Sequence, residues 1–217
     1  KSSAASDVYK RQTELISLTA FYKLIKNPIS RIEVASAGGY LSYENIADKA
    51  TVAGVEVEVR KNLFVRPLSS AANGMNKLSF GLNGSYIYTN AKMPLATVTT
   101  GSQLEGAAPW IANFDLSHNF TKGNHSFINT LVLNYVSDKI YTIGTQGYQD
   151  IMEQGMMTLD FVSQAKLNKY VSLTLKARNL LNPSYKLSRK ANESGEKVVL
   201  SDYKKGINIS LGVSCTF

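Results

Sequence analysis

The chain has 217 residues, a formal net charge of +8 and a hydrophobic fraction of 44%. No stretch approaches the roughly 18 consecutive apolar residues that a membrane-spanning helix needs, so the sequence excludes a helical membrane protein. The 24 Lys and Arg residues are scattered and form no basic patch with interleaved aromatic residues, which argues against nucleic-acid binding. The single cysteine, Cys215, makes no internal disulfide, and we expect it to be a small filler on an apolar surface.

Residues 1–12 (KSSAASDVYKRQ) are polar and follow no periodic pattern. Such a segment is typical of what sequence assembly or cloning leaves at a chain end. We therefore expect a non-native or unstructured tail at 1–12 and a single β domain at 13–217. An exported protein needs a signal peptide and none is recognisable after Lys1, so we expect a mature chain or one whose front is missing.

Apolar side chains recur at every second position along most of the chain, which predicts β-strands with one apolar and one polar face. The pattern is clearest from Ile207 to Phe217, where the intervening residues are polar or glycine. The first strand is less regular, because Phe21 falls on its polar side. The expected strands are 13–34, 41–62, 75–92, 107–121, 124–142, 153–168, 170–191 and 196–217.

Short and long connections alternate along much of the chain, as in barrels with short turns on the periplasmic side and long loops outside. The links at 121–123 and 168–169 are tight, whereas those at 91–106 and 143–154 are long. If Phe217 ends in the periplasm, both tight turns fall on the periplasmic side. The link at 62–76 should then be short, yet it reads as long.

Three features favour a transmembrane β-barrel over a soluble sheet. The strands are long, and the mid-strand charges all fall on the polar face, where they avoid a lipid-facing cost of about 2–4 kcal/mol for Arg or Lys. Tyrosines and the one tryptophan lie near strand ends, as in an aromatic girdle. These charges are Glu56, Glu58, Arg60, Asp115, Asp160, Lys166, Lys176 and Arg178, and these aromatic residues are Tyr22, Tyr86, Tyr88, Trp110, Tyr135, Tyr141 and Tyr170.

Four segments together resemble the barrel of TonB-dependent receptors, especially those of Bacteroidetes-like bacteria. Ala50–Leu63 (ATVAGVEVEVRKNL) is similar to a segment common in these receptors, and Gly106–Phe120 (GAAPWIANFDLSHNF) resembles the strand of the barrel that follows an extracellular loop. Val171–Tyr185 (VSLTLKARNLLNPSY) resembles the penultimate strand with its Asn-Leu-Leu bulge, and Ile207–Phe217 resembles the closing strand. The resemblance extends over about residues 13–217. It implies an all-β, antiparallel, up-and-down transmembrane barrel, of which this chain is about the last eight of 22 strands.

The resemblance also implies the function of such a protein and its interaction partners. It implies a bacterial outer-membrane receptor, and not an enzyme, that imports a scarce ligand such as a siderophore, a cobalamin or a glycan. The expected partners are outer-membrane lipid, an N-terminal plug and further strands of the same chain, an inner-membrane energy-coupling complex that acts through the plug, and the barrel-assembly machinery. The assembly signal would comprise Leu211, Val213 and Phe217, and Cys215 departs from the larger residue expected beside it.

The side chains offer no catalytic, metal or cofactor constellation. His118 and His125 flank a turn, and we interpret them as hydrogen-bonded interfacial residues rather than a metal pair. Glu56 and Glu58, like Asp160 and Lys166, are expected to be polar wall residues of an aqueous interior. Ligand contacts are expected from the inner wall and the long loops, with Tyr40, Tyr148 and Gln149 as candidates.

Three alternatives remain open at this point. A complete eight-stranded outer-membrane barrel with an adhesive or structural role is the main one, because eight strands suffice to close a barrel. A soluble lipocalin-like binder would fold without detergent. An outer-membrane lipase or protease would need a Ser, His and acid set that the sequence does not offer.

Overall fold

The computed structural model describes residues 2–11, of which only the backbone is considered, and 14–34, 39–68, 74–91, 103–145, 147–191 and 194–216. The strands in these residues are all antiparallel to their sheet neighbours. None of the described residues belongs to a helix long and apolar enough to span a membrane.

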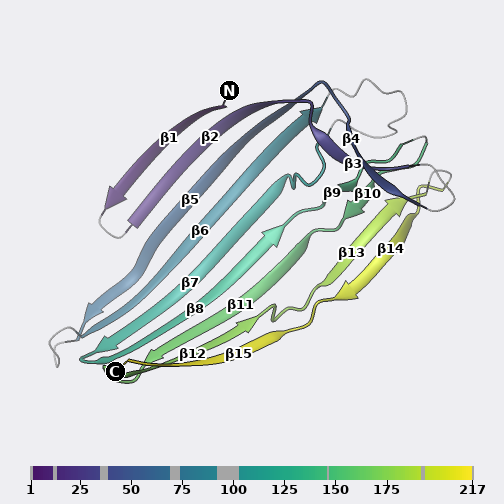
Figure 1. Ribbon diagram of the computed structural model, residues 1–217. Coiled ribbons are helices and arrows are strands. Elements are labelled where there is room, and N and C mark those ends of the chain that lie inside the picture. Colours follow the sequence, from purple (N-terminus) through teal and green to yellow (C-terminus); the bar gives the residue numbers. More distant parts are fainter. Residues whose placement is uncertain are drawn as a thin grey trace.

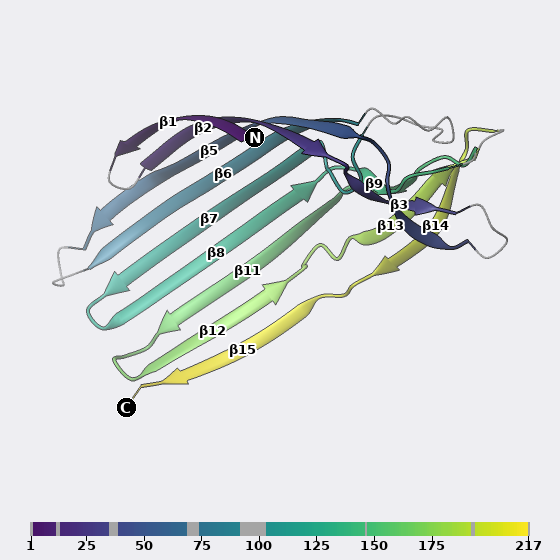
Figure 2. The same ribbon diagram turned by 45° about the horizontal axis from the view of Figure 1, so that its top comes forward.

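Nine strands form one curved sheet, and each pairs with the strand of this same sheet that follows it in the sequence (Figures 1 and 2). The tight turns at Gly123 and Lys169 lie at one end of the strands, which we call the turn end. We call the opposite end of the strands the loop end. In sheet order the strands are β1 (Ser2–Arg11), β2 (Glu14–Lys26), β5 (Lys49–Pro67), β6 (Met75–Ala91), β7 (Trp110–Lys122), β8 (His125–Val136), β11 (Met156–Lys166), β12 (Val171–Arg178) and β15 (Asn208–Cys215).

Local chemistry explains the tight connections of the turn end. Gly123 has a φ of 58°, a conformation that glycine adopts without strain, and it lets Lys122 pair directly with His125. The side chain of Asn168 accepts hydrogen bonds from the backbone N–H groups of Tyr170 and Val171 at 2.8 and 2.9 Å. Both turns therefore need few residues.

The prediction of a long link at 62–76 is wrong. The strand β5 continues to Pro67 through a bulge between Asn62 and Phe64, and Leu68 N donates to Gly74 O at 2.9 Å. A bulge inserts one residue and shifts the alternation, so the regular apolar pattern ends at the bulge although the strand continues. This link also belongs to the turn end, as the alternation of short and long links requires.

Six of the eight expected strands are interrupted toward the loop end, so the prediction of unbroken strands is also wrong. Asn27, Asn179 and Gly206 have φ values of 51°, 58° and 84°, and Pro28 offers no N–H to a ladder. The pieces beyond these breaks are β3 (Ile29–Glu33), β4 (Leu41–Asn45), β9 (Lys139–Thr142), β10 (Ile151–Glu153), β13 (Ser184–Lys190) and β14 (Lys197–Lys204).

These outer pieces form two small sheets with a packed core between them. One has the order β14-β13-β10-β9, and the other is the hairpin β3–β4. The hairpin leaves the sheet between β2 and β5 and reaches β9, where Ile32 bridges to Ile143 (Figure 2). Buried apolar side chains hold the two together: Ile32, Ile46, Ala47, Ala50, Ala91, Ile140 and Ile143.

The two faces of the large sheet differ as expected. One row of Cα partners runs Arg60–Gly81–Asp115–Val132–Asp160, and the strand register places all eight mid-strand charges named above on this polar face. The other face exposes apolar side chains, including Ile16, Leu18, Val57, Leu82, Met157 and Leu211. Lys61 is an exception that the sequence pattern missed, because its Cα partner is Phe80 on the apolar face.

The first segment does not lie outside the fold as expected. Residues Ser2–Arg11 pair along their whole length with β2 as the strand β1. A sheet edge presents unpaired backbone N–H and C=O groups, and these accept a strand of almost any sequence. The expectation of an unstructured tail is therefore wrong, while its non-native origin stays a prediction.

Candidate ligand-binding site at the loop end

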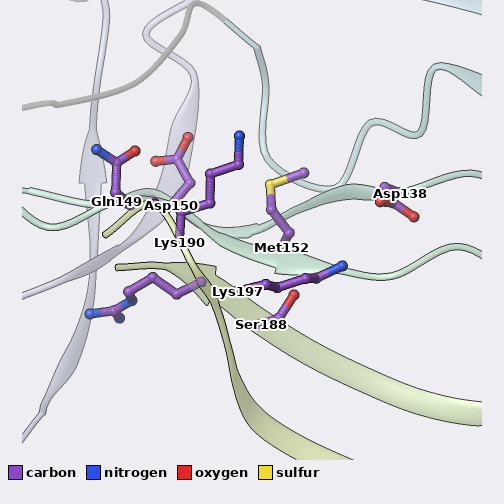
Figure 3. A pocket seen from close by; sticks show the side chains of 9 residues that line it. Asp138, Gln149, Asp150, Met152, Ser188, Lys190 and Lys197 are labelled. Carbon is purple, nitrogen blue, oxygen red and sulfur yellow. The ribbon is translucent and has the colours of Figure 1, made fainter. Parts of the chain in front are cut away.

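A cavity of about 380 Å³ lies at the loop end, between β10, β13, the start of β14 and the segment before β10 (Figure 3). Its lining combines both signs of charge with neutral polar groups and one thioether. We call it the loop-end pocket. The residues that line it are Asp138, Gln149, Asp150, Met152, Ser188, Arg189, Lys190, Gly195 and Lys197.

Backbone donors fix the two carboxylates of the pocket. Asp138 accepts a hydrogen bond from Gly155 N at 2.5 Å, and Asp150 accepts one from Gly144 N at 2.8 Å. Charge-assisted hydrogen bonds of this kind are stronger than neutral ones. The two carboxylates therefore hold the backbone around the pocket in place. The hydrogen bonds that do so occupy part of their capacity to accept from a ligand.

Arg189 connects the pocket to the hairpin β3–β4. Its guanidinium forms an ion pair with Glu33, and the two side chains are only 16% and 17% exposed. The same guanidinium lies over the ring of Tyr148, 5.3 Å from the centroid, and the backbone oxygen of Glu33 accepts a hydrogen bond from Thr145 Oγ1 at 2.5 Å. We call these contacts the latch, because they join strands on opposite sides of the curved sheet.

Lys190 and Lys197 bring two positive charges to the pocket. They are direct Cα partners across β13 and β14, an arrangement that like charges disfavour. Neither ammonium group forms an ion pair with any residue that the structure describes. In Figure 3 the two side chains extend in different directions from the strands. The pocket therefore offers cations that an anionic or strongly polar ligand can satisfy.

A half-buried tyrosine lies on the strands that carry the pocket. Tyr185 Oη donates to Glu153 Oε2 at 3.3 Å, and Glu153 also pairs with Lys139 at 3.2 Å. Burial, with the neighbouring Glu153 carboxylate, raises the pKa of Tyr185 to about 12. The phenol is thus a fixed hydrogen-bond donor at physiological pH.

Of the three loop candidates, Gln149 lines the pocket and Tyr148 contacts Arg189. Tyr40 lies elsewhere, with 70% of its side chain exposed. Sequence reasoning missed Lys190 and Lys197. The signal available was a lysine on each side of the short Asn-Glu-Ser-Gly connection, which a hairpin would bring face to face.

The other predicted residues are dispersed. His118 and Asn76 share a hydrogen bond of 2.8 Å, as an interfacial role requires, while His125 is exposed at the turn. Glu58 forms an ion pair with Arg60 at 2.7 Å, so Glu56 and Glu58 do not act as a pair of neighbouring acids. Among the described residues there is no group of three or more potential metal ligands.

The expected aromatic girdle is only partly present. Tyr22, Tyr86, Tyr88, Trp110 and Tyr135 are exposed on the apolar face toward the loop end, as predicted. The prediction is wrong for Tyr141, whose ring instead lies against the Arg31 guanidinium at 4.3 Å in the loop-end sheet. Tyr170 lies at the turn end beside Lys169.

The proposed assembly signal lies on the edge strand β15. Leu211 and Val213 are 72% and 63% exposed there, and Phe217 falls outside the described residues. Cys215 is exposed on the same strand. Recognition by the assembly machinery stays a prediction.

Comparison with known protein families gives a match over most of the chain. The family model described as "TonB dependent receptor-like, beta-barrel" matches residues 6–180, which is most of the chain. No curated protein and no solved structure matches it.

Proposed function

Because this chain belongs to the family of TonB-dependent receptor-like β-barrels, we propose that it takes part in the energy-coupled uptake of a scarce ligand. The family implies an outer-membrane receptor or transporter rather than an enzyme. The match over residues 6–180 is the observation that carries this proposal. A siderophore, a cobalamin and a glycan are the ligand classes to test first.

The surface of the sheet supports a membrane location. Its apolar face exposes large aliphatic side chains, with 53% of Leu18 and 72% of Leu211 accessible, whereas ionised groups such as Glu58 and Asp115 lie on the other face. In water such an exposed apolar surface is a liability for aggregation. In a bilayer it is the surface that lipid covers.

The edges of the sheet support a larger barrel. In the described sheet β1 and β15 each have one neighbour and do not pair with each other. An unpaired backbone group costs several kcal/mol in hydrocarbon, so the edges need further strands. We infer that these, with a plug, belong to the same protein, and that an inner-membrane complex supplies energy through the plug.

The loop-end pocket is the proposed point of ligand contact. It lies at the loop end, where the long connections join the strands. These connections would face the cell exterior if the turn end faces the periplasm. Its two lysines and its two fixed carboxylates suit a polar ligand with several hydrogen-bonding groups.

A transport assay tests the proposal. A deletion strain carrying the gene on a plasmid is compared with the empty strain for uptake of labelled ferric siderophores, cobalamin and oligosaccharides. We expect plasmid-dependent uptake of one class, and we expect a protonophore to abolish it while leaving surface binding intact. Uptake that survives the protonophore, or a chain that fractionates away from the outer membrane, would contradict the proposal.

A further inference from the structure

A cluster of polar side chains interrupts the apolar face near the turn end. His118 and Asn129 are direct Cα partners on β7 and β8. His118 is hydrogen-bonded to Asn76 at 2.8 Å, and Ser163 Oγ donates to Asn129 Oδ1 at 2.7 Å. All four are half-buried. Because Cα partners share a face, the cluster lies among Leu116, Phe120, Phe127 and Leu131, and not on the polar face.

A cation completes this cluster. Arg66 on β5 is the Cα partner of Asn76, and its guanidinium lies 5.4 Å from the centroid of the Phe64 ring. It forms no ion pair with any residue in the described ranges. We call Arg66, Asn76, His118, Asn129 and Ser163 the turn-end polar cluster.

Two side-chain donors of the cluster are available to a ligand. Within the described part of the chain, no hydrogen bond uses the side-chain amide nitrogens of Asn76 and Asn129. Donors that lack an acceptor where little water is present cost free energy. An acceptor from outside the sheet would satisfy them, and beside Arg66 it should carry negative charge.

The depth of the cluster indicates where that acceptor comes from. Along β6, Asn76 is ten residues from Tyr86, which lies in the aromatic group near the loop end. At about 3.3 Å per residue and a strand tilt of roughly 40°, this separation is about 25 Å across the membrane. The outward apolar band of such barrels is also about 25 Å tall. The cluster thus lies at the far boundary of the hydrocarbon, at the level of phospholipid headgroups and ester groups.

We propose that the turn-end polar cluster binds a phospholipid of the leaflet at the turn end. The phosphodiester anion accepts from the Arg66 guanidinium, and the ester oxygens accept from the amides of Asn76 and Asn129. His118 and Ser163 hold these amides in place through the bonds described above. The inference rests on the proposed membrane location and adds a specific lipid contact to it.

Lipid retention tests the inference. The protein is purified from outer membranes in mild detergent, and its bound phosphatidylglycerol is measured by native mass spectrometry during titration. Arg66→Gln should weaken binding about fivefold, corresponding to ~1 kcal/mol for one cation at an anionic surface. Asn76→Leu should weaken it about threefold, through the loss of one hydrogen-bond donor.

Lys26→Gln is the matched control, because it removes one cation from the loop end of the same face and should leave binding unchanged. Inorganic phosphate at the same concentration should not displace the lipid. Equal retention by Arg66→Gln and Lys26→Gln, or displacement by phosphate alone, overturns the proposal. Each variant is first checked for heat-modifiable migration, since a chain that fails to fold in detergent contradicts the membrane location instead.

Discussion

The ring of Phe21 lies over Gly54 on the polar face, where the two residues are Cα partners on β2 and β5. A Cβ added to Gly54 would meet this ring and would lie 2.7 Å from the backbone oxygen of Tyr86. The aromatic residue that breaks the alternation of the first strand thus covers a glycine that cannot carry a side chain. Phe21 on the polar face is therefore part of the packing and not an irregularity.

Two glycine variants test this packing. Gly54→Ala should lower stability by about 1–3 kcal/mol, because the new methyl group overlaps the Phe21 ring and the β6 backbone. Gly84→Ala is the control, since a Cβ there meets no atom within 4 Å. The temperature at which the folded band disappears in semi-native gels measures both. Equal losses for the two variants would show that the ring and Gly54 are not in close contact.

Tyr185 allows a prediction about pH. Its pKa of about 12 in the folded chain is above the ordinary value of 10.0, so the neutral phenol contributes stability that is complete below pH 10. That contribution is lost as pH rises from about 10 toward 12. Because the Glu153 carboxylate is part of the cause, Glu153→Gln should lower the pKa.

Difference absorbance of the tyrosinate band, taken between each chain and its Tyr185→Phe counterpart, isolates this phenol from the other tyrosines. We expect its midpoint to shift to lower pH in the Glu153→Gln background. An unchanged midpoint would mean that burial and the neighbouring Tyr141 and Tyr203, and not Glu153, raise the pKa of Tyr185.

Among the elements, the breaks in the strands are held by side-chain bonds and not only by backbone angles. Asn179 N donates to Asp160 Oδ1 at 2.8 Å, and its side-chain amide donates to Gly206 O at 2.7 Å. Gly206 N in turn donates to Asn182 Oδ1 at 3.0 Å. These bonds tie the interruption in β12–β13 to the one in β14–β15. The outer pieces can thus leave the large sheet together.

Asn179 should accordingly tolerate little change. Asn179→Val places a β-branched residue at a φ of 58° and removes the bond to Gly206, so we expect a loss of about 2–4 kcal/mol. Asn179→Gly keeps the backbone angle and should lose only about 1 kcal/mol, for the missing side-chain bond. Denaturant unfolding in detergent measures the difference. Equal stability of the two variants would contradict the role of the left-handed angle.

The hairpin β3–β4 is the element that the latch holds. Glu33→Gln leaves the Arg189 charge half-buried without its partner, and we expect about 2 kcal/mol less stability at the loop end. Limited proteolysis should then cut within the hairpin, while the large sheet stays intact. The double reversal Glu33→Arg with Arg189→Glu should restore resistance. Failure of the reversal to restore it would indicate that Tyr148 and Thr145, rather than the ion pair, secure the hairpin.

At the scale of the whole molecule, the alternation of side chains was enough to predict the faces of the sheet and its order. Each charge from Glu56 to Arg178 that the period of two assigned to the polar face lies there. The breaks were not predicted, because the alternation continues on both sides of residues such as Asn27 and Pro28. The latch could not be predicted at all, since Glu33 and Arg189 are 156 residues apart and only the curvature of the sheet brings them together.

The single tryptophan provides a test of how the molecule lies in a bilayer. Trp110 is 56% exposed on the apolar face, its ring 4.6 Å from that of Tyr86, at the level where an aromatic girdle meets the headgroups. In vesicles, brominated lipids labelled near the headgroup should quench its fluorescence more strongly than lipids labelled near the chain ends. Trp110→Phe should abolish the signal and so assign it. Efficient quenching by aqueous acrylamide with no effect of either brominated lipid would show that the ring faces water. That result would rule out the membrane-facing orientation on which the proposed roles of the pocket, the latch and the lipid contact depend.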